Sequence, residues 1–317
     1  MKMKRIKPIL AFIACSLVFS SAPAQEQRVR FIVAFAPGGI ADTLARMVGQ
    51  RVSEQLGRPV TVENRGGAGG NIAARQVAAM PPDGTAFLVH TTAFAINPSL
   101  YRDAGYEAAQ FVPVALIATT PEMIAAHPSV TAANIRQFFD DMRGKPVTYS
   151  TAGVGTSSHL AGEYLLRHLG GMDATHVPFQ GGTPAVAAAV GNQVMLVSTS
   201  MPTAVPQIRA GRLKGLAMMS AKRSSALPDV PTTLEAGIPL EASGWVGVLA
   251  PPGTKIDIAA RMNGEIAQTV RNSDIRERLE SLGFEPAGGS AEEFAAYLRK
   301  EVAKWANIAR SAGIKQD

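Results

Sequence analysis

Cysteine is almost absent from this chain, since Cys15 is the only one in 317 residues. It lies in a segment with the three parts of a secretory signal: a basic start, an apolar stretch over residues 9–19, and small residues at 22–24. We therefore expect export, with cleavage after Ala24. The mature chain then contains no thiol, which excludes disulfides, cysteine nucleophiles and thiolate metal sites.

Long hydrophobic runs are also lacking. The apolar stretch of the signal is shorter than the about 20 residues that span a bilayer, and no later stretch reaches that length. The same shortness argues against a lipobox ending at Cys15, which is the alternative interpretation of this segment. We expect an exported, soluble product.

An excess of one charge sign disappears once the signal is removed. The whole chain has a formal charge of +6, from 31 basic and 25 acidic residues. Four of the basic residues and none of the acidic ones lie in residues 1–24, which leaves a mature charge of +2. Nothing in this charge favours nucleic acid as a partner. A hydrophobic content of 46% instead indicates a globular fold with a sizeable core.

Short β-branched runs alternate with helical patterns along the chain. Strands are expected at 29–35, 60–63 and 86–90, with helices at 41–56 and 71–79 between them. This rhythm is typical of parallel βαβ units and predicts an α/β fold. A last helix is expected after a capping box formed by Ser290 and Glu293, with an apolar stripe at Phe294, Leu298, Val302 and Trp305.

A weak internal repeat indicates two similar halves. Residues 30–39 form a strand, a glycine turn and the start of a helix, and residues 146–155 repeat that order. Each unit is followed by a second strand and another glycine loop, at 66–70 and at 181–182. We interpret the halves as two facing domains. In such sheets ligands bind beyond the carboxyl ends of the strands, where these turns lie.

The two glycine turns have the composition of an anion site. A glycine-rich turn before a helix exposes backbone N–H groups at the positive end of that helix, where a carboxylate or phosphate is stabilised. The alternative is that the glycines only permit tight turns, and the occurrence of two such turns favours binding. Valine at Gly39 or at Gly155 is then expected to weaken binding without unfolding the protein. Asp42 is an exception, because its charge suits a helix cap better than a carboxylate contact.

The sequence lacks the motifs of nucleotide binding, zinc binding and serine hydrolysis. The sequence contains no G-x-x-x-x-G-K-[ST], and the glycines at 67–70 lack the spacing of a dinucleotide fingerprint. The five histidines show no zinc-ligand spacing, so we expect neither a metal nor a cofactor. The G-x-S-x-G motif of hydrolases is absent around Ser157 and Ser158, and we interpret both serines as ligand donors or helix caps.

Several motifs occur in an order that resembles a known family. They include Phe35-Ala-Pro-Gly-Gly39, Val62-Glu-Asn-Arg65, Gly67-Ala-Gly-Gly-Asn71, Ala95-Ile-Asn-Pro98, Ser157-Ser-His-Leu-Ala-Gly-Glu163, Ala221-Lys-Arg223, Leu227-Pro-Asp-Val-Pro231 and Glu235-Ala-Gly237. Together they resemble the substrate-binding proteins of tripartite tricarboxylate transporters, the Bug family, over about residues 28–315.

The resemblance implies a two-lobed, Venus-flytrap fold of type II, with a mostly parallel sheet flanked by helices in each lobe. Residues 1–24 are then the signal peptide, residues 25–120 and 247–317 the first lobe, and residues 121–246 the second. The resemblance further implies a monomeric, non-enzymatic periplasmic protein. Such a protein closes over a small carboxylate and delivers it to the integral membrane subunits of a transporter.

The resemblance also implies the ligand contacts, carried over by position. The first loop contributes Phe35, Ala36, Pro37, Gly38, Gly39, Ala41 and Asp42, and the second contributes Ser150, Thr151, Ala152, Gly153, Gly155, Thr156, Ser157 and His159. The first lobe adds Thr91, Thr92 and Asn97, and the variable end of the site has Phe179, Gln180, Thr199 and Trp245. For Thr91, Thr92 and Asn97 the alternative is a role in turns, and for Trp245 it is a place in the core.

One departure from the family pattern bears on the ligand. Family members often have acidic residues where this chain has Met195 and Thr199. If the acid at the position of Thr199 normally pairs with an amino group of the ligand, its loss favours a ligand without an ammonium group. Such a ligand is a di- or tricarboxylate, aromatic ones included. Two other functions stay open: an exported hydrolase that uses Ser157 or Ser158 with His159, and a binding protein that reports to a sensor.

Overall fold

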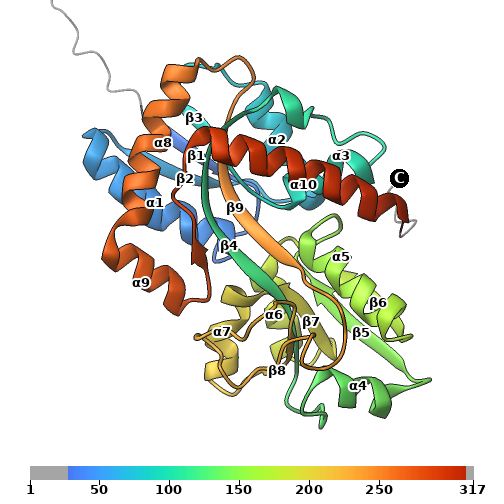
Figure 1. Ribbon diagram of the computed structural model, residues 1–317. Helices are drawn as coiled ribbons and strands as arrows, with labels where there is room; N and C mark the ends of the chain where they lie inside the picture. Colours follow the sequence, from blue (N-terminus) through green and yellow to red (C-terminus); the bar gives the residue numbers. More distant parts are fainter. Residues whose placement is uncertain (1–27, 312–317) are drawn as a thin grey trace, which may run out of the picture.

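The structure is a computed structural model and describes residues 28–311, so Cys15 and the expected cleavage site after Ala24 lie outside the described residues. The chain folds into two lobes joined by long strands, one above the other in Figure 1. In both lobes helices alternate with strands and cover the sheets. The expected α/β class and two-lobed arrangement are confirmed.

The first lobe contains the elements before the crossing strand β4 and those from β9 onward. They are β1 (Val29–Val33), α1 (Ile40–Leu56), β2 (Val60–Asn64), η1 (Ala68–Gly70), α2 (Asn71–Ala78), β3 (Ala86–Thr91), α3 (Ala93–Leu100), η2 (Ala108–Gln110), β9 (Ser243–Ala250), α8 (Ile256–Arg271), α9 (Ser273–Ser281), β10 (Glu285–Pro286) and α10 (Ala291–Ser311).

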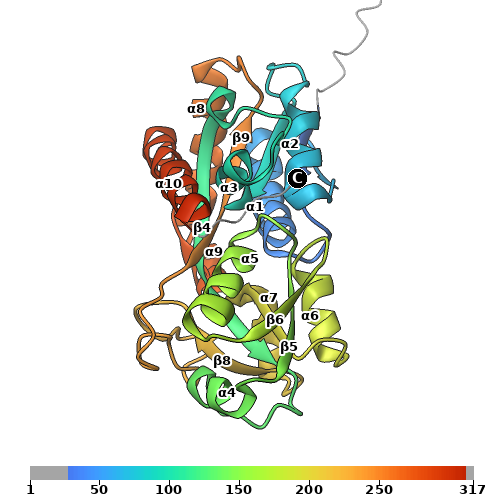
Figure 2. The same cartoon turned by 90° about the vertical axis from the view of Figure 1, so that its right-hand side faces the viewer.

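The second lobe contains the elements that follow β4 (Val112–Ala126). They are α4 (Ile135–Met142), β5 (Pro146–Thr151), α5 (Ser157–Glu163), the π-helical turn η3 (Tyr164–Leu169), β6 (Asp173–Pro178), α6 (Gly182–Val190), β7 (Leu196–Ser200), α7 (Met201–Arg209) and β8 (Lys214–Met218). The turned view in Figure 2 shows this lobe below the first, with α4 at the far end.

Each lobe has a mixed sheet. In the first lobe β1 lies parallel between β2 and β3, and β9 then pairs antiparallel with both β3 and β4. In the second lobe β5 lies parallel between β6 and β7, while β4 pairs antiparallel with β7 and β8. The parallel strands come from the two repeated units. The antiparallel ones arise because β4 and β9 run between the lobes in opposite directions.

Strand β4 connects the two sheets without interruption. Its residues from Val112 to Pro121 pair with β9, and those from Glu122 to Ala126 pair with β7. The change of partner therefore falls between Pro121 and Glu122. A movement of one lobe against the other must pass through this point and through the start of β9.

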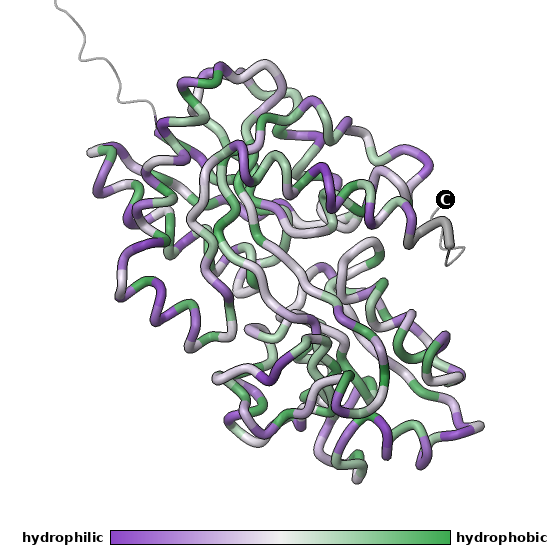
Figure 3. Tube along the Cα trace, viewed as in Figure 1, coloured by the Kyte–Doolittle hydropathy of each residue, from purple (hydrophilic) through white to green (hydrophobic). Residues whose placement is uncertain are grey.

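The apolar residues form separate cores in the two lobes, seen as green segments inside each lobe in Figure 3. The first core contains residues up to Ala118 and again from Trp245 onward, together with Leu160 of α5 in the second lobe. Two further clusters contain residues between Met123 and Ala242. No residue from 119 to 122 belongs to any of these described cores, which again places the crossing there.

The last helix is built as its sequence predicts. The Ser290 backbone N–H donates to Glu293 at 2.8 Å, and the Glu293 N–H donates to the Ser290 hydroxyl at 3.2 Å, which is a capping box. Phe294, Leu298 and Trp305 are buried against the first lobe. The expected capped helix with an apolar stripe is confirmed.

A pair of glycines offers a test of this packing. A methyl group on Gly247 in β9 would overlap the ring of Phe294, whereas one on Gly264 in α8 would meet no atom within 4 Å. We expect Gly247→Ala to lower the free energy of unfolding by about 1–3 kcal/mol through overpacking. Gly264→Ala should raise it by about 0.5–1 kcal/mol, because alanine favours a helix. Urea denaturation of both variants checks this, and equal effects would contradict the packing described.

Candidate functional site

A small buried cavity lies where the carboxyl ends of strands from both lobes meet. Phe35 follows β1, Thr91 ends β3, Ala152 follows β5, and Thr199 lies near the end of β7. The cavity has a volume of about 30 Å³, which is room for about two water molecules. Its walls are formed by Phe35, Gly39, Ile40, Ala41, Thr91, Ala152, Thr156, Ser157, Ser158, Gly182, Thr199, Ser200 and Thr203.

Four helices begin at the walls of this cavity. Gly39 precedes α1, Thr156 precedes α5, Gly182 opens α6, and Ser200 precedes α7. The first N–H groups of a helix have no partner within the helix, and the helix dipole makes this end positive. None of the residues in 28–311 that line the cavity is charged. The arrangement therefore suits a small anion held by N–H and hydroxyl donors alone.

The first of the two predicted loops is fixed by an ion pair between the buried Asp42 carboxylate and the exposed Arg46 side chain. The Gly38 N–H donates to the Asp42 carboxylate at 2.8 Å, and Arg46 pairs with the same carboxylate at 2.9 Å. Burial alone would raise the pKa of Asp42, but the bonds from Arg46 and Gly38 outweigh it and lower the pKa. Asp42 is thus ionised, neutralised by Arg46, and absent from the cavity wall. Asp42 therefore stabilises the loop through Gly38 and Arg46 and does not contact the cavity, which agrees with the expectation that it would not bind a carboxylate.

The second loop is closed by hydroxyl groups. The Thr156 hydroxyl donates to the Gly153 carbonyl at 2.7 Å and accepts from the His159 N–H at 3.2 Å, so it caps α5. Ser158 lies 2.9 Å from the Thr156 hydroxyl and accepts from the Ala152 N–H at 3.4 Å. These bonds keep the start of α5 directed at the cavity.

A buried acid lies behind two of the cavity hydroxyls. Glu122 in β4 is fully buried and accepts hydrogen bonds from Ser157 at 2.6 Å and from Ser200 at 2.9 Å, both on Oε1. Burial raises the pKa of Glu122 to about 7, although the two hydroxyls act in the opposite direction. Sequence reasoning missed this residue. Its one available signal was that it is the single acid in the otherwise uncharged run from Val112 to Ala126.

The histidines near the site are neutral and do not activate a serine. His159 stacks on His176 with ring centroids 4.3 Å apart, and His176 Nε2 lies 2.7 Å from the Thr151 hydroxyl. Burial, followed by the neighbouring His159, lowers the pKa of His176 to about 3. Ser157 bonds Glu122 instead, and no hydrogen bond in the described part of the chain joins Ser157 or Ser158 to His159. The serine–histidine pair of the hydrolase alternative is therefore not assembled.

A groove adjoins the cavity and shares Phe35 and Ala152 with it. Its volume is about 320 Å³, and it runs between the glycine loop at 67–70 and the residues Phe179 and Gln180. The lobes touch along it. The Ala36 N–H donates to the Gln180 carbonyl at 3.3 Å, and the Tyr101 hydroxyl donates to the Val154 carbonyl at 3.3 Å.

The predicted contact residues divide into three groups. Eight line the cavity: Phe35, Gly39, Ala41, Thr91, Ala152, Thr156, Ser157 and Thr199. Gly153, Phe179 and Gln180 line the adjoining groove. The remaining ones lie in the supporting loops or behind the walls: Ala36, Pro37, Gly38, Asp42, Thr92, Asn97, Ser150, Thr151, Gly155, His159 and Trp245.

The supporting residues are held behind the cavity wall by hydrogen bonds and packing within the protein. The Thr92 hydroxyl accepts from the Trp245 backbone N–H at 2.9 Å, and Trp245 itself is buried beside Phe294. Asn97 donates to Asn71 at 2.6 Å. Ser150 donates to the Ala185 carbonyl at 2.8 Å. In this structure Trp245 occupies the core position that the sequence left as its alternative.

Gly155 is not interchangeable with Gly39 as a probe of binding. Gly155 has a φ of +79°, and a Cβ there would overlap the Asn97 side chain. Gly39 has a φ of −76°, and a Cβ there would meet only the Ala36 carbonyl, at 3.5 Å. The expectation that valine at Gly155 leaves the fold intact is wrong, because left-handed backbone and a filled neighbouring space both oppose it.

Comparison with known proteins identifies the family. Residues 44–314 match the model of the tripartite tricarboxylate transporter family receptor.

The chain belongs to this family.

The resemblance to Bug proteins is also confirmed: BugT of Bordetella pertussis is 30% identical over 311 residues, covering 96% of this chain and 94% of BugT.

Two solved structures are similar to this receptor over nearly its whole length. Rpa4515 of R. palustris, solved with adipate, is 33% identical with a TM-score of 0.88, and the match covers 92% of this chain and 99% of that one. MatC of Rhodopseudomonas palustris, solved with bound malate, is 32% identical with a TM-score of 0.83, and the match covers 89% and 98%.

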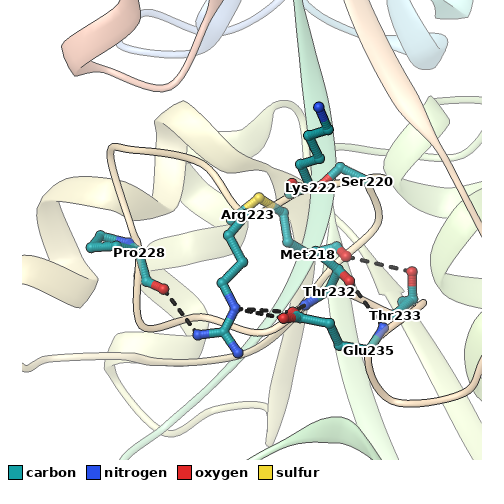
Figure 4. Close-up of polar contacts among 8 residues, drawn as sticks. All are labelled: Met218, Ser220, Lys222, Arg223, Pro228, Thr232, Thr233 and Glu235. Carbon is teal, nitrogen blue, oxygen red and sulfur yellow. Dashed lines mark hydrogen bonds and ion pairs between the residues drawn. The ribbon is translucent and has the colours of Figure 1, made fainter.

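Other motifs of the receptor family form a loop of the second lobe after β8. Arg223 donates to both carboxylate oxygens of Glu235, at 2.9 and 3.0 Å, and to the Pro228 carbonyl at 3.0 Å (Figure 4). The Thr232 N–H donates to Glu235 at 2.7 Å. Arg223 thereby also lowers the pKa of Glu235. These contacts fix the loop and explain the motifs without a ligand.

A wider groove of about 830 Å³ lies between this loop and the first lobe. Both charge signs line it, and three of its basic residues are paired: Arg223 with Glu235, Arg276 with Glu280, and Lys304 with Glu301. It therefore lacks the excess positive charge of an anion site. None of the described helices has the length and apolar character that crossing a membrane requires. The described residues also contain no cluster of three or more His, Cys, Asp or Glu able to hold a metal.

A buried histidine beside the first loop predicts sensitivity to acid. His90 packs against Phe35, and burial lowers its pKa from 6.5 to about 4. Between these values the unfolded chain binds a proton that the folded protein does not, so stability falls as the pH drops below 6.5. We expect a loss of about 2 kcal/mol at pH 5 relative to pH 8 from this group.

Urea denaturation at several pH values measures this loss. His90→Gln should flatten the dependence between pH 6.5 and 5, whatever its effect on absolute stability. The control is His127→Gln, since His127 bonds Ser129 in a loop. An unchanged slope in the His90 variant would contradict the assignment.

Proposed function

We propose that this receptor is exported to the periplasm, with its signal cleaved after Ala24, and there captures a small carboxylate for the membrane subunits of a tripartite transporter. The observation that carries the proposal is the start of four helices around one uncharged cavity. Helix N-termini bind carboxylates through backbone N–H groups. The relatives solved with adipate and with malate support the same ligand class.

The ligand carries no ammonium group. Thr199, which replaces an acid of the family pattern, is buried at the cavity wall. Asp42 is neutralised by Arg46, and Glu122 lies behind Ser157 and Ser200. No carboxylate at the wall formed by the described residues is therefore available to an amino group. One carboxylate of the ligand occupies the cavity, and the rest extends into the groove beside Phe179 and Gln180.

Binding requires the lobes to move. The lobes touch along the groove through the Ala36–Gln180 and Tyr101–Val154 hydrogen bonds, so the ligand enters when the lobes separate and is enclosed when they close. The movement occurs at residues 119–122 and 243–247, between a first lobe of residues 25–120 and 247–317 and a second of 121–246. The membrane subunits recognise the closed, liganded form, whose population the ligand increases.

The receptor acts as a monomer and without catalysis. The separation of both serines from His159 supports a binding role, because a serine nucleophile needs a base within hydrogen-bond reach. Neither a cofactor nor a nucleic acid enters this function.

The first test is calorimetric titration of residues 25–317 with adipate, malate, succinate and citrate, and with aspartate and glutamate. We expect binding of at least one unsubstituted or hydroxylated carboxylate and at least tenfold weaker binding of the amino acids. Gly39→Val should weaken binding at least tenfold, since its side chain stands where the α1 N–H groups face the ligand.

The matched control is Gly264→Val, at an open position on α8. Both variants should keep the wild-type circular dichroism spectrum. Wild-type affinity in the Gly39 variant would remove the α1 terminus from the site, and failure of every carboxylate to bind would refute the proposed function.

A second test places an acid at the cavity wall. Thr199→Asp should weaken carboxylate binding at least 100-fold, because like charges repel strongly in a buried site. Thr199→Val keeps the shape of the side chain and should cost far less. The Kd of each variant for the best ligand of the panel decides the matter. Equal losses in the two variants would show that charge at this position is irrelevant.

A further inference from the structure

Glu122 is a buried acid whose hydrogen bonds are incomplete. Its Oε1 accepts from two serine hydroxyls, while Oε2 is buried and has no hydrogen-bond partner among the described residues. A Cβ on Gly244 in β9 would come within 2.9 Å of Oε1, so the backbone of β9 closes this side. A buried carboxylate oxygen without a donor favours the neutral, protonated acid.

The two serines connect this acid to the ligand cavity. Ser157 and Ser200 both line the cavity, and both hydroxyl protons are used in the bonds to Glu122. Each serine oxygen then has only lone pairs left to direct elsewhere. While Glu122 is ionised, neither hydroxyl can donate to a bound carboxylate, and the negative charge of Glu122 repels it.

No cationic side chain of residues 28–311 pairs with Glu122. The sheet neighbours β7 and β9 contain no titratable side chain, and the single one in β8, Lys214, donates to the Val130 carbonyl. The remaining titratable groups on elements around this part of β4 are His159 and Glu163 on α5, Glu285 on β10, Arg209 on α7, and the Asp42–Arg46 pair across the cavity. Glu163 bonds Tyr149 and Arg167 instead. Within the described part of the chain, Ser157 and Ser200 alone bond the carboxyl group directly.

We infer that binding of a carboxylate is coupled to uptake of one proton by Glu122. This inference rests on the proposed function. A proton from solvent adds to Oε1, and Oε1–H then donates to one serine oxygen. That serine turns its own hydroxyl proton toward the ligand carboxylate. The proton on Glu122 offsets the charge that the ligand carboxylate brings, so the site carries one negative charge before and after binding. Glu122 is a positioning residue that acts through Ser157 or Ser200.

The sign of the pH dependence follows from this coupling. The pKa of Glu122 in the unliganded protein is about 7, and a nearby ligand anion raises it further. Above pH 7 the ligand must therefore bring in a proton, so its affinity falls as the pH rises. If only the protonated form binds, the Kd is about 30-fold weaker at pH 8.5 than at pH 6.

Calorimetry counts these protons directly. Adipate and malate are titrated from pH 6.5 to 8.5 in two buffers that lack an anionic group and differ in ionisation enthalpy, bis-Tris propane and Tris. We expect the wild-type receptor to take up a fraction of a proton at pH 6.5 and close to one at pH 8.5. If a histidine took up the proton instead, the uptake would fall as the pH rises, because burial lowers the pKa values of His159 and His176.

Two variants assign the proton. Glu122→Gln keeps the size of the side chain and should abolish both proton uptake and the pH dependence of the Kd. The matched control is Glu285→Gln on β10, an acid that accepts a hydrogen bond from Thr119 and lies outside the cavity. It should behave as wild type.

The outcomes separate the two proposals. Carboxylate binding with no proton uptake between pH 7 and 8.5 overturns the coupling and leaves the proposed function intact. Uptake that persists in Glu122→Gln also overturns it. If no carboxylate binds at any pH, both proposals fail together. The wild-type proton count needs no variant, so a poorly folding Glu122→Gln protein would not remove the test.

Discussion

The starts of four helices around one uncharged cavity are the constraint on which the rest of this structure depends. Helices α1, α5, α6 and α7 begin at one small cavity, and the described walls supply no charged side chain to satisfy their N–H groups. Such donors require water or an anion. Glycine at Gly39 and Gly182 allows close approach, and the hydroxyls of Thr156, Ser157 and Ser200 add to the same polarity. The chemistry of the site follows from this geometry.

The same geometry explains why a buried acid occurs beside an anion site. Glu122 occupies the point where β4 changes partner from β9 to β7, so its carboxyl group reaches the starts of α5 and α7 through Ser157 and Ser200. It competes with a ligand for these hydroxyls. The strand that links the lobes thus also carries an ionisable group that is hydrogen-bonded to two hydroxyls of the cavity wall. Protonation, ligand binding and lobe position are therefore linked through β4.

Local features of the fold were predictable from sequence, and long-range ones were not. The loops after β1 and β5 were found because a strand, glycines and a helix follow one another within about ten residues. Ser200 and Thr203 were missed because only the packing of β7 and α7 against the crossing strand brings them to the cavity. From sequence, Trp245 suited a ligand site and a core position equally well, and in the structure it packs against Phe294 in the core. The strain at Gly155 depends on Asn97, 58 positions earlier.

The most direct test of the central claim is a crystal structure of residues 25–317 grown with adipate. The account predicts one carboxylate of the ligand within about 3 Å of backbone N–H groups at the starts of α1 and α5, with the chain of the ligand directed toward Phe179. It also predicts that no basic side chain contacts that carboxylate. Adipate bound instead in the wide groove beside Lys222, with the helix starts occupied only by water, would contradict the account.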